Sequence, residues 1–311
     1  MEKLDEYIDK FINHQKARNY SQGTIQSYFY TLKFYKCYLQ KAQIEEKDFF
    51  ILSSVISFIN YLDEYKQENG KPLSEWTKLG IISSLKTYFN YLFENDYILI
   101  DPFDKIDKIK LPHKLPKNIP TEQEVIAIIE SIDTTTVKGY RTRTIIELLY
   151  STGIRRIELT NLTIYDVDLN NGFIRVQKTK FSRFRILPVG KIACQFLEEY
   201  INTIRPQLLK NNIHEHTLFL NQYGKKYSLT GISTLVRVTV RKILKSAKYS
   251  CHSFRHACAT EMLKGNANIK YVQDMLGHKE LSSTQIYTQV LPLDLLQVHK
   301  TTHPSWTLFD E

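Results

Sequence analysis

The chain has 311 residues, 42% of them hydrophobic, so it is long enough and apolar enough for two domains with their own cores. It has no run of 18 apolar residues, and the charged residues after Met1 are unlike a secretion signal, so neither a membrane span nor an export signal is expected. Lysine and arginine number 42 against 33 acidic residues. The net charge of +9 favours a polyanion as a partner, although any basic soluble protein would show the same balance.

None of the four cysteines stands in a Cys-x-x-Cys pair. In a chain without an export signal, this absence predicts reduced, buried thiols and a cytoplasmic protein. The four residues are Cys37, Cys194, Cys251 and Cys258.

The first hundred residues are predicted to form a helical domain, because three stretches carry apolar side chains at the spacing of one helix face. These stretches are residues 28–39, 55–62 and 81–92. Ser21 and Ser74 precede the first and third stretches and are the predicted N-caps. The outer faces carry lysines that are either ordinary solvated charges or contacts to a DNA backbone, namely Lys33, Lys36, Lys78 and Lys86.

Residues 108–120 are the predicted linker between two domains, since they hold three prolines and four lysines. Prolines at this density disfavour both helix and central strand. An extended segment of this length spans ~35 Å at about 3.1 Å per residue, which exceeds the width of a DNA duplex. The segment is therefore either a plain spacer or the strap of a C-shaped clamp on DNA, with Lys110, Lys114 and Lys117 at the phosphates. The domains on either side are residues 1–107 and 121–311.

The second domain is predicted to combine helices with a small antiparallel sheet. Thr121 and Glu124 form a capping box, and a helix through residues 144–149 should end near Gly153. An Asn-Gly turn at residues 170–172 separates apolar runs at 164–169 and 173–177, and a third run at 184–189 follows a short basic segment. Further helices are expected over residues 190–203, 228–246, 253–264, 268–276 and 281–288. The predicted fold class is thus mainly α, with a helical bundle followed by an α+β domain.

Five polar residues of this domain belong to the residue types that cleavage of a phosphodiester requires. Guanidinium groups offer forked, permanent charge to phosphate oxygens, histidines move protons near neutral pH, and a tyrosine oxygen can hold a phosphoryl group covalently. Either Arg155 or its neighbour Arg156 could be a surface charge, but the preceding Thr152-Gly-Ile favours Arg155 as the site residue. His252 and Arg255 form His-x-x-Arg, His278 follows Leu-Gly, and Tyr287 comes nine residues later.

His252 and His256 stand four residues apart and could be read as a zinc pair on a helix. However, the glutamate of the metalloprotease pattern is missing after the first histidine, and no third ligand is evident nearby. No metal is therefore predicted, and His256 is expected to support the site or contact a phosphate.

In the order of these residues, the chain resembles the tyrosine recombinases, most closely the compact Xer-type and mobile-element members, over roughly residues 145–290. The resemblance implies that Arg155 and Arg255 bind the non-bridging oxygens of the scissile phosphate. It implies that Tyr287 attacks the phosphorus and leaves a 3′-phosphotyrosine and a free 5′-hydroxyl. His252 and His278 would stabilise the transition state and assist proton transfer. Glu158 would brace the site from behind.

The resemblance also implies a lysine on the β-hairpin as general acid for the leaving 5′-oxygen. Lys180 occupies that place, with Lys178 as its competitor, because the glycines usual beside this lysine are Thr179 and Phe181 here. Lys178 and Arg183 are expected to contact DNA phosphates. The apolar tail after Tyr287 would dock into a neighbouring subunit or fold back on its own domain.

The function implied is a site-specific DNA recombinase that needs no cofactor and works through a Holliday junction. It would act as a homotetramer on two duplexes with inverted half-sites, and as a monomer or dimer when free. Dimer resolution, integration, excision and inversion all fit, with or without an accessory protein. The alternatives are a type IB topoisomerase-like enzyme, a catalytically silent DNA-binding protein of the same fold, and an unrelated basic helical protein.

Overall fold

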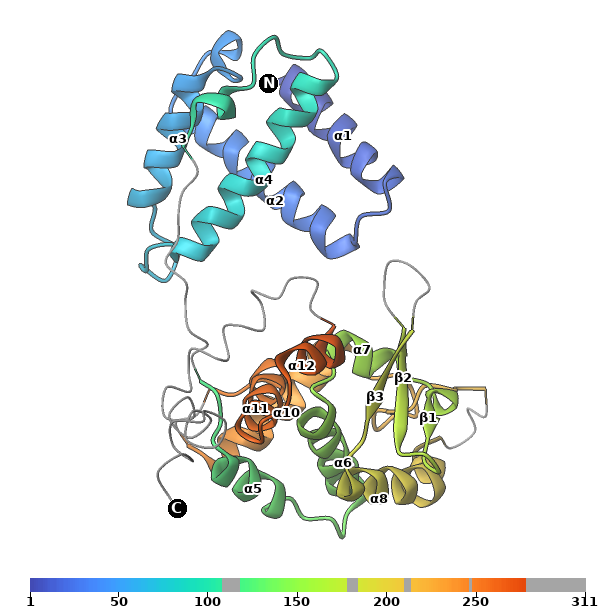
Figure 1. Ribbon diagram of the computed structural model, residues 1–311. Helices are drawn as coiled ribbons and strands as arrows, with labels where there is room; N and C mark the ends of the chain where they lie inside the picture. Colours follow the sequence, from blue (N-terminus) through green and yellow to red (C-terminus); the bar gives the residue numbers. More distant parts are fainter. Residues whose placement is uncertain (108–117, 178–183, 210–213, 246–247, 278–311) are drawn as a thin grey trace, which may run out of the picture. The chain divides into compact units, whose positions relative to one another are not determined.

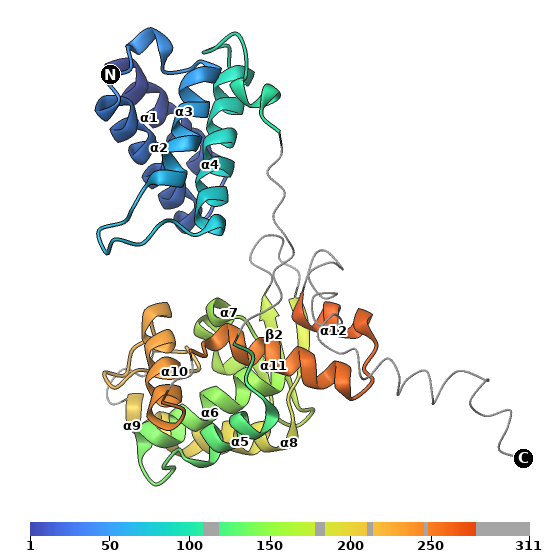
Figure 2. The same ribbon diagram turned by 90° about the vertical axis from the view of Figure 1, so that its left-hand side faces the viewer.

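The computed structural model describes residues 1–107, 118–177, 184–209, 214–245 and 248–277 (Figure 1). The chain divides into two compact units, Met1–His113 and Lys114–Glu311. The first unit is built from helices, and the second combines helices with a small antiparallel sheet (Figure 2). The predicted fold class is therefore confirmed. Within the described ranges, no helix is both long and apolar enough to cross a membrane.

The first unit packs four α-helices around one core. Ser21 and Ser74 cap the second and fourth helices, because their hydroxyls accept the backbone N–H groups of Thr24 at 3.2 Å and Thr77 at 3.1 Å. Both predicted caps are thereby confirmed. The helices are α1 (Glu2–Ala17), α2 (Gln22–Lys41), α3 (Leu52–Glu64) and α4 (Glu75–Glu94), with short 3₁₀ turns η1 (Glu46–Asp48) and η2 (Pro102–Lys105).

Aromatic side chains dominate the core of this unit. The rings of Tyr35 and Phe58 meet edge to face with their centroids 5.0 Å apart, and both residues are fully buried. The Tyr35 hydroxyl donates to the carbonyl of Phe49 at 2.7 Å, so the polar end of this buried ring is satisfied. The three predicted apolar stripes face this core. A fourth stripe, on α1, was not singled out in the sequence.

The second unit contains most of the helices. Thr121 and Glu124 form the predicted capping box. The helix predicted to end at residue 203 continues to Leu209 through a π-helical turn, Tyr200–Ile204. The wider turn stands just before Pro206, whose ring would clash with the preceding turn of a regular α-helix. The helices are α5 (Glu122–Glu130), α6 (Val137–Thr152), α7 (Arg156–Asn161), α8 (Lys191–Glu199), α9 (Arg205–Leu209), α10 (Leu229–Ile243), α11 (Cys251–Lys264) and α12 (Ile269–Leu276).

The sheet has three antiparallel strands in the order β1 (Val167–Asp168), β2 (Phe173–Gln177) and β3 (Phe184–Pro188). β2 has the predicted bounds, but the strand predicted over residues 164–169 was too long. Its first half is a 3₁₀ turn, Ile164–Asp166, closed by the Asp166 carboxylate, which accepts the N–H of Thr163 at 2.8 Å. β2 and β3 alternate between exposed and buried residues, and Val176 pairs with Arg185 on the buried face.

The cysteines are all free thiols. Cys251 and Cys258 are buried and Cys194 is half-buried, but Cys37 is exposed, so the expectation of buried thiols was wrong for that residue. Cys37 lies on the solvent side of α2, next to the buried Tyr38.

Two features of the second unit prepare the site. Helix α6 ends at Gly153, which has the left-handed backbone conformation predicted for a helix-ending residue (φ 58°). The chain then turns into Arg155, the N-cap residue of α7. Helix α12 packs beside α11 and next to β3 (Figure 1). The ends of α6 and α12 and the start of α11 therefore meet.

Replacing Gly153 by alanine should destabilise the second unit. A Cβ there would lie 2.8 Å from Cδ2 of Leu276, and the left-handed backbone alone costs other residues about 1–2 kcal/mol. Thermal unfolding should shift down by about 2–8 °C. Gly265→Ala is the matched control, because φ is −76° there and the nearest atom would be 3.4 Å away. Equal melting temperatures for the two variants would contradict this description of the α6 terminus.

Candidate active site

Arg155, His252 and Arg255 line one cavity in the second unit, although about a hundred residues separate the first from the others. The cavity measures about 440 Å³. It lies where the loop after α6 meets the N-terminal ends of α10 and α11, and its other lining residues are Ile154, Arg156, Ile157, Leu229, Ser233, Ser250 and Cys251. The structure thus brings together the three predicted catalytic residues that it describes.

Arg255 is buried almost completely, with 1% of its surface exposed. Its guanidinium donates through Nη1 to the carbonyl of Gly153 at 2.6 Å and through Nη2 to that of Leu276 at 2.5 Å. These carbonyls belong to the C-terminal ends of α6 and α12. Because the C-terminal end of a helix carries partial negative charge, this is a favourable place for a buried cation.

Arg155 is held beside it by the next carbonyl along the chain. Its Nη2 donates to the carbonyl of Gly277 at 2.6 Å, and its Nη1 donates to Oε1 of Glu158 at 3.0 Å. The side chain remains 37% exposed. A guanidinium has five N–H donors, and only these two are engaged with residues that the structure describes, so the others can serve a ligand in the cavity.

Glu158 lies behind Arg155 and is 7% exposed. Its oxygens accept Nη1 and Nη2 of Arg185, each at 2.7 Å, in addition to the backbone N–H and the side chain of Arg155. Burial alone would raise the pKa of Glu158, but the hydrogen bonds and charge of Arg185, with a smaller contribution from Arg155, leave that pKa below its ordinary value. Glu158 is therefore a buried carboxylate shared by two arginines.

Arg185 is the site residue that sequence reasoning missed. It stood inside an apolar run that predicted a strand, and no motif marked it. One signal was available, since the alternation of β3 places it on the same face as the buried Leu187. An arginine on the buried face of a strand needs partners inside the protein.

His252 lies in the first turn of α11, with its ring edge to face against His256 at a centroid distance of 4.2 Å. The side chain keeps contact with solvent. Partial burial of the ring, then the charges of Arg255 and Arg155, lower the pKa of His252 from its ordinary value of 6.5. The imidazole is therefore neutral near pH 7 and can accept a proton.

Arg156 also lines the cavity, and its Nη1 donates to the hydroxyl of Ser233 on α10. The sequence favoured Arg155 over Arg156 as the phosphate-binding residue. Its position adds a third guanidinium to the wall of the cavity. Across the described part of the chain, no group of three histidine, cysteine or acidic side chains is arranged to hold a metal ion.

The predicted lysine contacts of the first unit differ in their surroundings. Lys33 and Lys86 are exposed. Lys36 pairs with Asp5 at 2.5 Å, and Lys78 pairs with Asp63 at 2.6 Å and Glu75 at 3.0 Å. These two ammonium groups would have to share their charge between a carboxylate and a phosphate.

Eight of the predicted site residues lie outside the described residues. Gly277, which the structure describes, comes directly before one of them and contacts Arg155. The eight are Lys110, Lys114, Lys117, Lys178, Lys180, Arg183, His278 and Tyr287.

Known proteins match this chain over nearly its whole length. Residues 119–293 match the phage integrase family, and residues 3–110 match the phage integrase SAM-like domain. A tyrosine recombinase XerD of Staphylococcus saprophyticus is 34% identical over 301 residues, which cover 97% of this chain and 98% of the relative. A tyrosine recombinase XerC 2 of Ralstonia nicotianae is 32% identical over 302 residues, which cover 97% of this chain and 86% of the relative.

Solved structures share the fold. A XerH site-specific recombinase bound to a palindromic difH substrate matches with a TM-score of 0.74 and 24% identity, covering 94% of this chain and 83% of that one. A lambda integrase dimer bound to a core site matches with a TM-score of 0.67 and 18% identity, covering 91% and 94%. The family match and the identity to XerD show that the chain belongs to the phage integrase family and is a Xer-type tyrosine recombinase.

Proposed function

We propose that this DNA strand-exchange enzyme performs site-specific recombination with Tyr287 as the nucleophile and with Arg155 and Arg255 bound to the scissile phosphate. The supporting observation is that two guanidinium groups are held on consecutive carbonyls, those of Leu276 and Gly277, at one cavity. The pentacoordinate state of phosphoryl transfer carries more negative charge than the diester. Donors fixed in advance stabilise that extra charge without having to reorganise.

The first chemical step joins the phenolic oxygen of Tyr287 to phosphorus and breaks the bond from phosphorus to the 5′-oxygen. The proton of the phenol passes to a base, and the neutral imidazole of His252 supports that role. Lys180 delivers a proton to the departing 5′-oxygen, and His278 stabilises the crowded phosphorus. The 3′-phosphotyrosine keeps the phosphoryl group activated, so a 5′-hydroxyl of the partner duplex can reverse the step.

We further propose a division of labour along the chain. Residues 1–107 grip core DNA, residues 108–120 cross the backbone, and residues 121–311 perform the chemistry in the cytoplasm. The XerH and lambda integrase structures bound to DNA support double-stranded DNA as the partner. Inverted half-sites and a homotetrameric synapse complete the proposal, because two duplexes with two cleavage points each require four active subunits. The phosphate contacts would come from Lys33, Lys36, Lys78, Lys86, Lys110, Lys114, Lys117, Lys178, Arg183 and His256.

A type IB topoisomerase would form the same covalent adduct. The two activities differ in outcome, because a topoisomerase rejoins the strand that it cut, whereas a recombinase joins strands of two duplexes. The relationship to XerD and XerC recombinases favours strand exchange.

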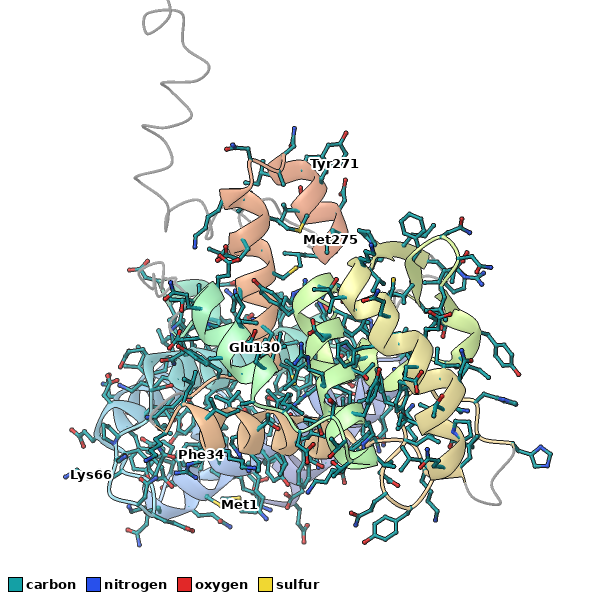
Figure 3. All side chains as sticks on the ribbon, turned by 90° about the horizontal axis from the view of Figure 1, so that it is seen from below. Met1, Phe34, Lys66, Glu130, Tyr271 and Met275 are labelled. Carbon is teal, nitrogen blue, oxygen red and sulfur yellow. The ribbon has the colours of Figure 1, made fainter. Side chains whose placement is uncertain are left out.

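Tyr287→Phe should abolish covalent attachment to DNA while retaining DNA binding, because the phenylalanine lacks the attacking oxygen. The assay is a nicked suicide duplex carrying the inverted-repeat target, incubated with EDTA and resolved under denaturing conditions. Tyr271→Phe is the matched control, since Tyr271 is 72% exposed on α12 and points away from the unit (Figure 3). The control should form the adduct at the wild-type rate. An adduct with Tyr287→Phe would remove Tyr287 from the mechanism.

The cleavage rate should fall as the pH drops below 6.5, through the lowered pKa of His252. The free energy of unfolding should fall over the same window, because the unfolded chain binds a proton near pH 6.5 that the native imidazole resists until the pH is lower. Titration of the His252 ring signal by NMR measures the native pKa directly. Arg155→Gln should raise it by removing a nearby positive charge. A native pKa at or above 6.5 would contradict this account of His252.

A further inference from the structure

We propose that Arg185 is a positioning residue for Arg155: it neutralises Glu158, so that the charge of Arg155 is available to the scissile phosphate. This inference rests on the function proposed above. Arg185 lies on β3, and its guanidinium does not line the cavity. Its effect on the reaction would therefore pass through the side chains between it and the substrate.

The hydrogen bonds of Glu158 are divided unequally between the two arginines. Arg185 meets both carboxylate oxygens with two parallel bonds of 2.7 Å, the forked geometry that makes guanidinium–carboxylate pairs strong. The guanidinium of Arg155 makes one longer bond of 3.0 Å to Oε1. The side chain of Arg185 is 7% exposed against 37% for Arg155. The buried partner therefore balances most of the charge of Glu158.

The net charge beside the cavity depends on Arg185. Glu158, Arg155 and Arg185 together carry one surplus positive charge. Without Arg185, the same carboxylate would have only Arg155 as an ion-pair partner among the residues that the structure describes, and the surplus would vanish. A buried carboxylate left with one partner attracts that partner strongly, because the low dielectric of the interior screens little. Arg155 would then be drawn toward Glu158 and away from a phosphate.

Arg185 also fixes the end of α12. Its Nε donates to the carbonyl of Met275 at 3.0 Å, one residue before the carbonyl that receives Arg255 and two before the carbonyl that receives Arg155. A Cβ on Gly277 would lie 3.3 Å from Nη1 of Arg155 and 3.3 Å from Nη1 of Arg185, so both guanidinium groups lie close to this residue. The position of Arg155 is thus set by Arg185 from two sides, through Glu158 and through the α12 terminus.

The test is single-turnover cleavage of the nicked suicide duplex by the full-length protein, with DNA affinity measured in parallel. Arg185→Met should slow adduct formation by about 10²-fold, since a displacement of a positioned group by about 1 Å costs that much. Affinity for DNA should change less than about threefold, because Arg185 does not reach the cavity. Arg185→Lys keeps the charge but not the fork, and should give an intermediate rate.

Charge rescue separates this role from simple stabilisation of the fold. In Arg185→Met/Glu158→Gln, the carboxylate that captures Arg155 is gone, so the rate should recover at least about tenfold over Arg185→Met. Arg175→Met is the matched control, because Arg175 lies on the exposed face of the neighbouring strand and donates to the carbonyl of Tyr165. It should cleave at the wild-type rate.

Each outcome decides the matter. Two results would overturn the role of Arg185 while leaving the proposed function intact, provided that the wild-type protein forms the adduct. One is full activity of Arg185→Met, and the other is a double variant that is no faster than Arg185→Met. If Arg185→Met does not fold, the rates of adduct formation by Arg185→Lys and by the double variant carry the test. A lysine variant that cleaves as fast as the wild-type protein would likewise overturn the role. Absence of an adduct with the wild-type protein would overturn the proposed function, and the positioning role with it.

Discussion

Three consecutive backbone carbonyls at the end of α12 each accept a hydrogen bond from a different arginine. Met275 receives Arg185, Leu276 receives Arg255, and Gly277 receives Arg155. The arginines come from β3, α11 and the start of α7, so one helix terminus collects side chains from three distant parts of the sequence. Guanidinium groups repel one another, and the carbonyl dipoles of a helix end offset that repulsion at fixed positions.

The rest of the second unit can be understood from this arrangement. Gly153 ends α6 so that its carbonyl meets Arg255, and Gly277 ends α12 with a left-handed backbone that leaves room for two guanidinium groups. The carboxylate of Glu158 offsets part of the positive charge of the arginines. It lies behind Arg155, so it does not compete with a ligand in the cavity for the remaining N–H donors of that side chain. Partial burial, and then the charges of Arg255 and Arg155, lower the pKa of His252 and so favour its neutral form. A neutral base beside two cations suits a phosphoryl transfer whose nucleophile must lose a proton.

Local signals in the sequence predicted the local features well. The caps at Ser21, Ser74 and Thr121 and the end of α6 are confirmed, because each depends on residues within one turn. The strand before the Asn-Gly turn was predicted too long, because Asp166 closes a turn with Thr163 that hydrophobicity does not reveal. Arg185 was missed for a related reason: its partners lie 27 and 90 positions away, and only the folded chain places them together. The assignments of Tyr287, His278 and Lys180 stay predictions.

The most direct measurement is an experimental structure of the Tyr287→Phe protein bound to an uncleaved target duplex. The account predicts that Arg155 and Arg255 both contact non-bridging oxygens of one phosphate at about 2.7–3.2 Å. It also predicts that each keeps its bond to the α12 terminus, at Gly277 and at Leu276. Arginines bound to two different phosphates, or released from those carbonyls when DNA binds, would contradict it.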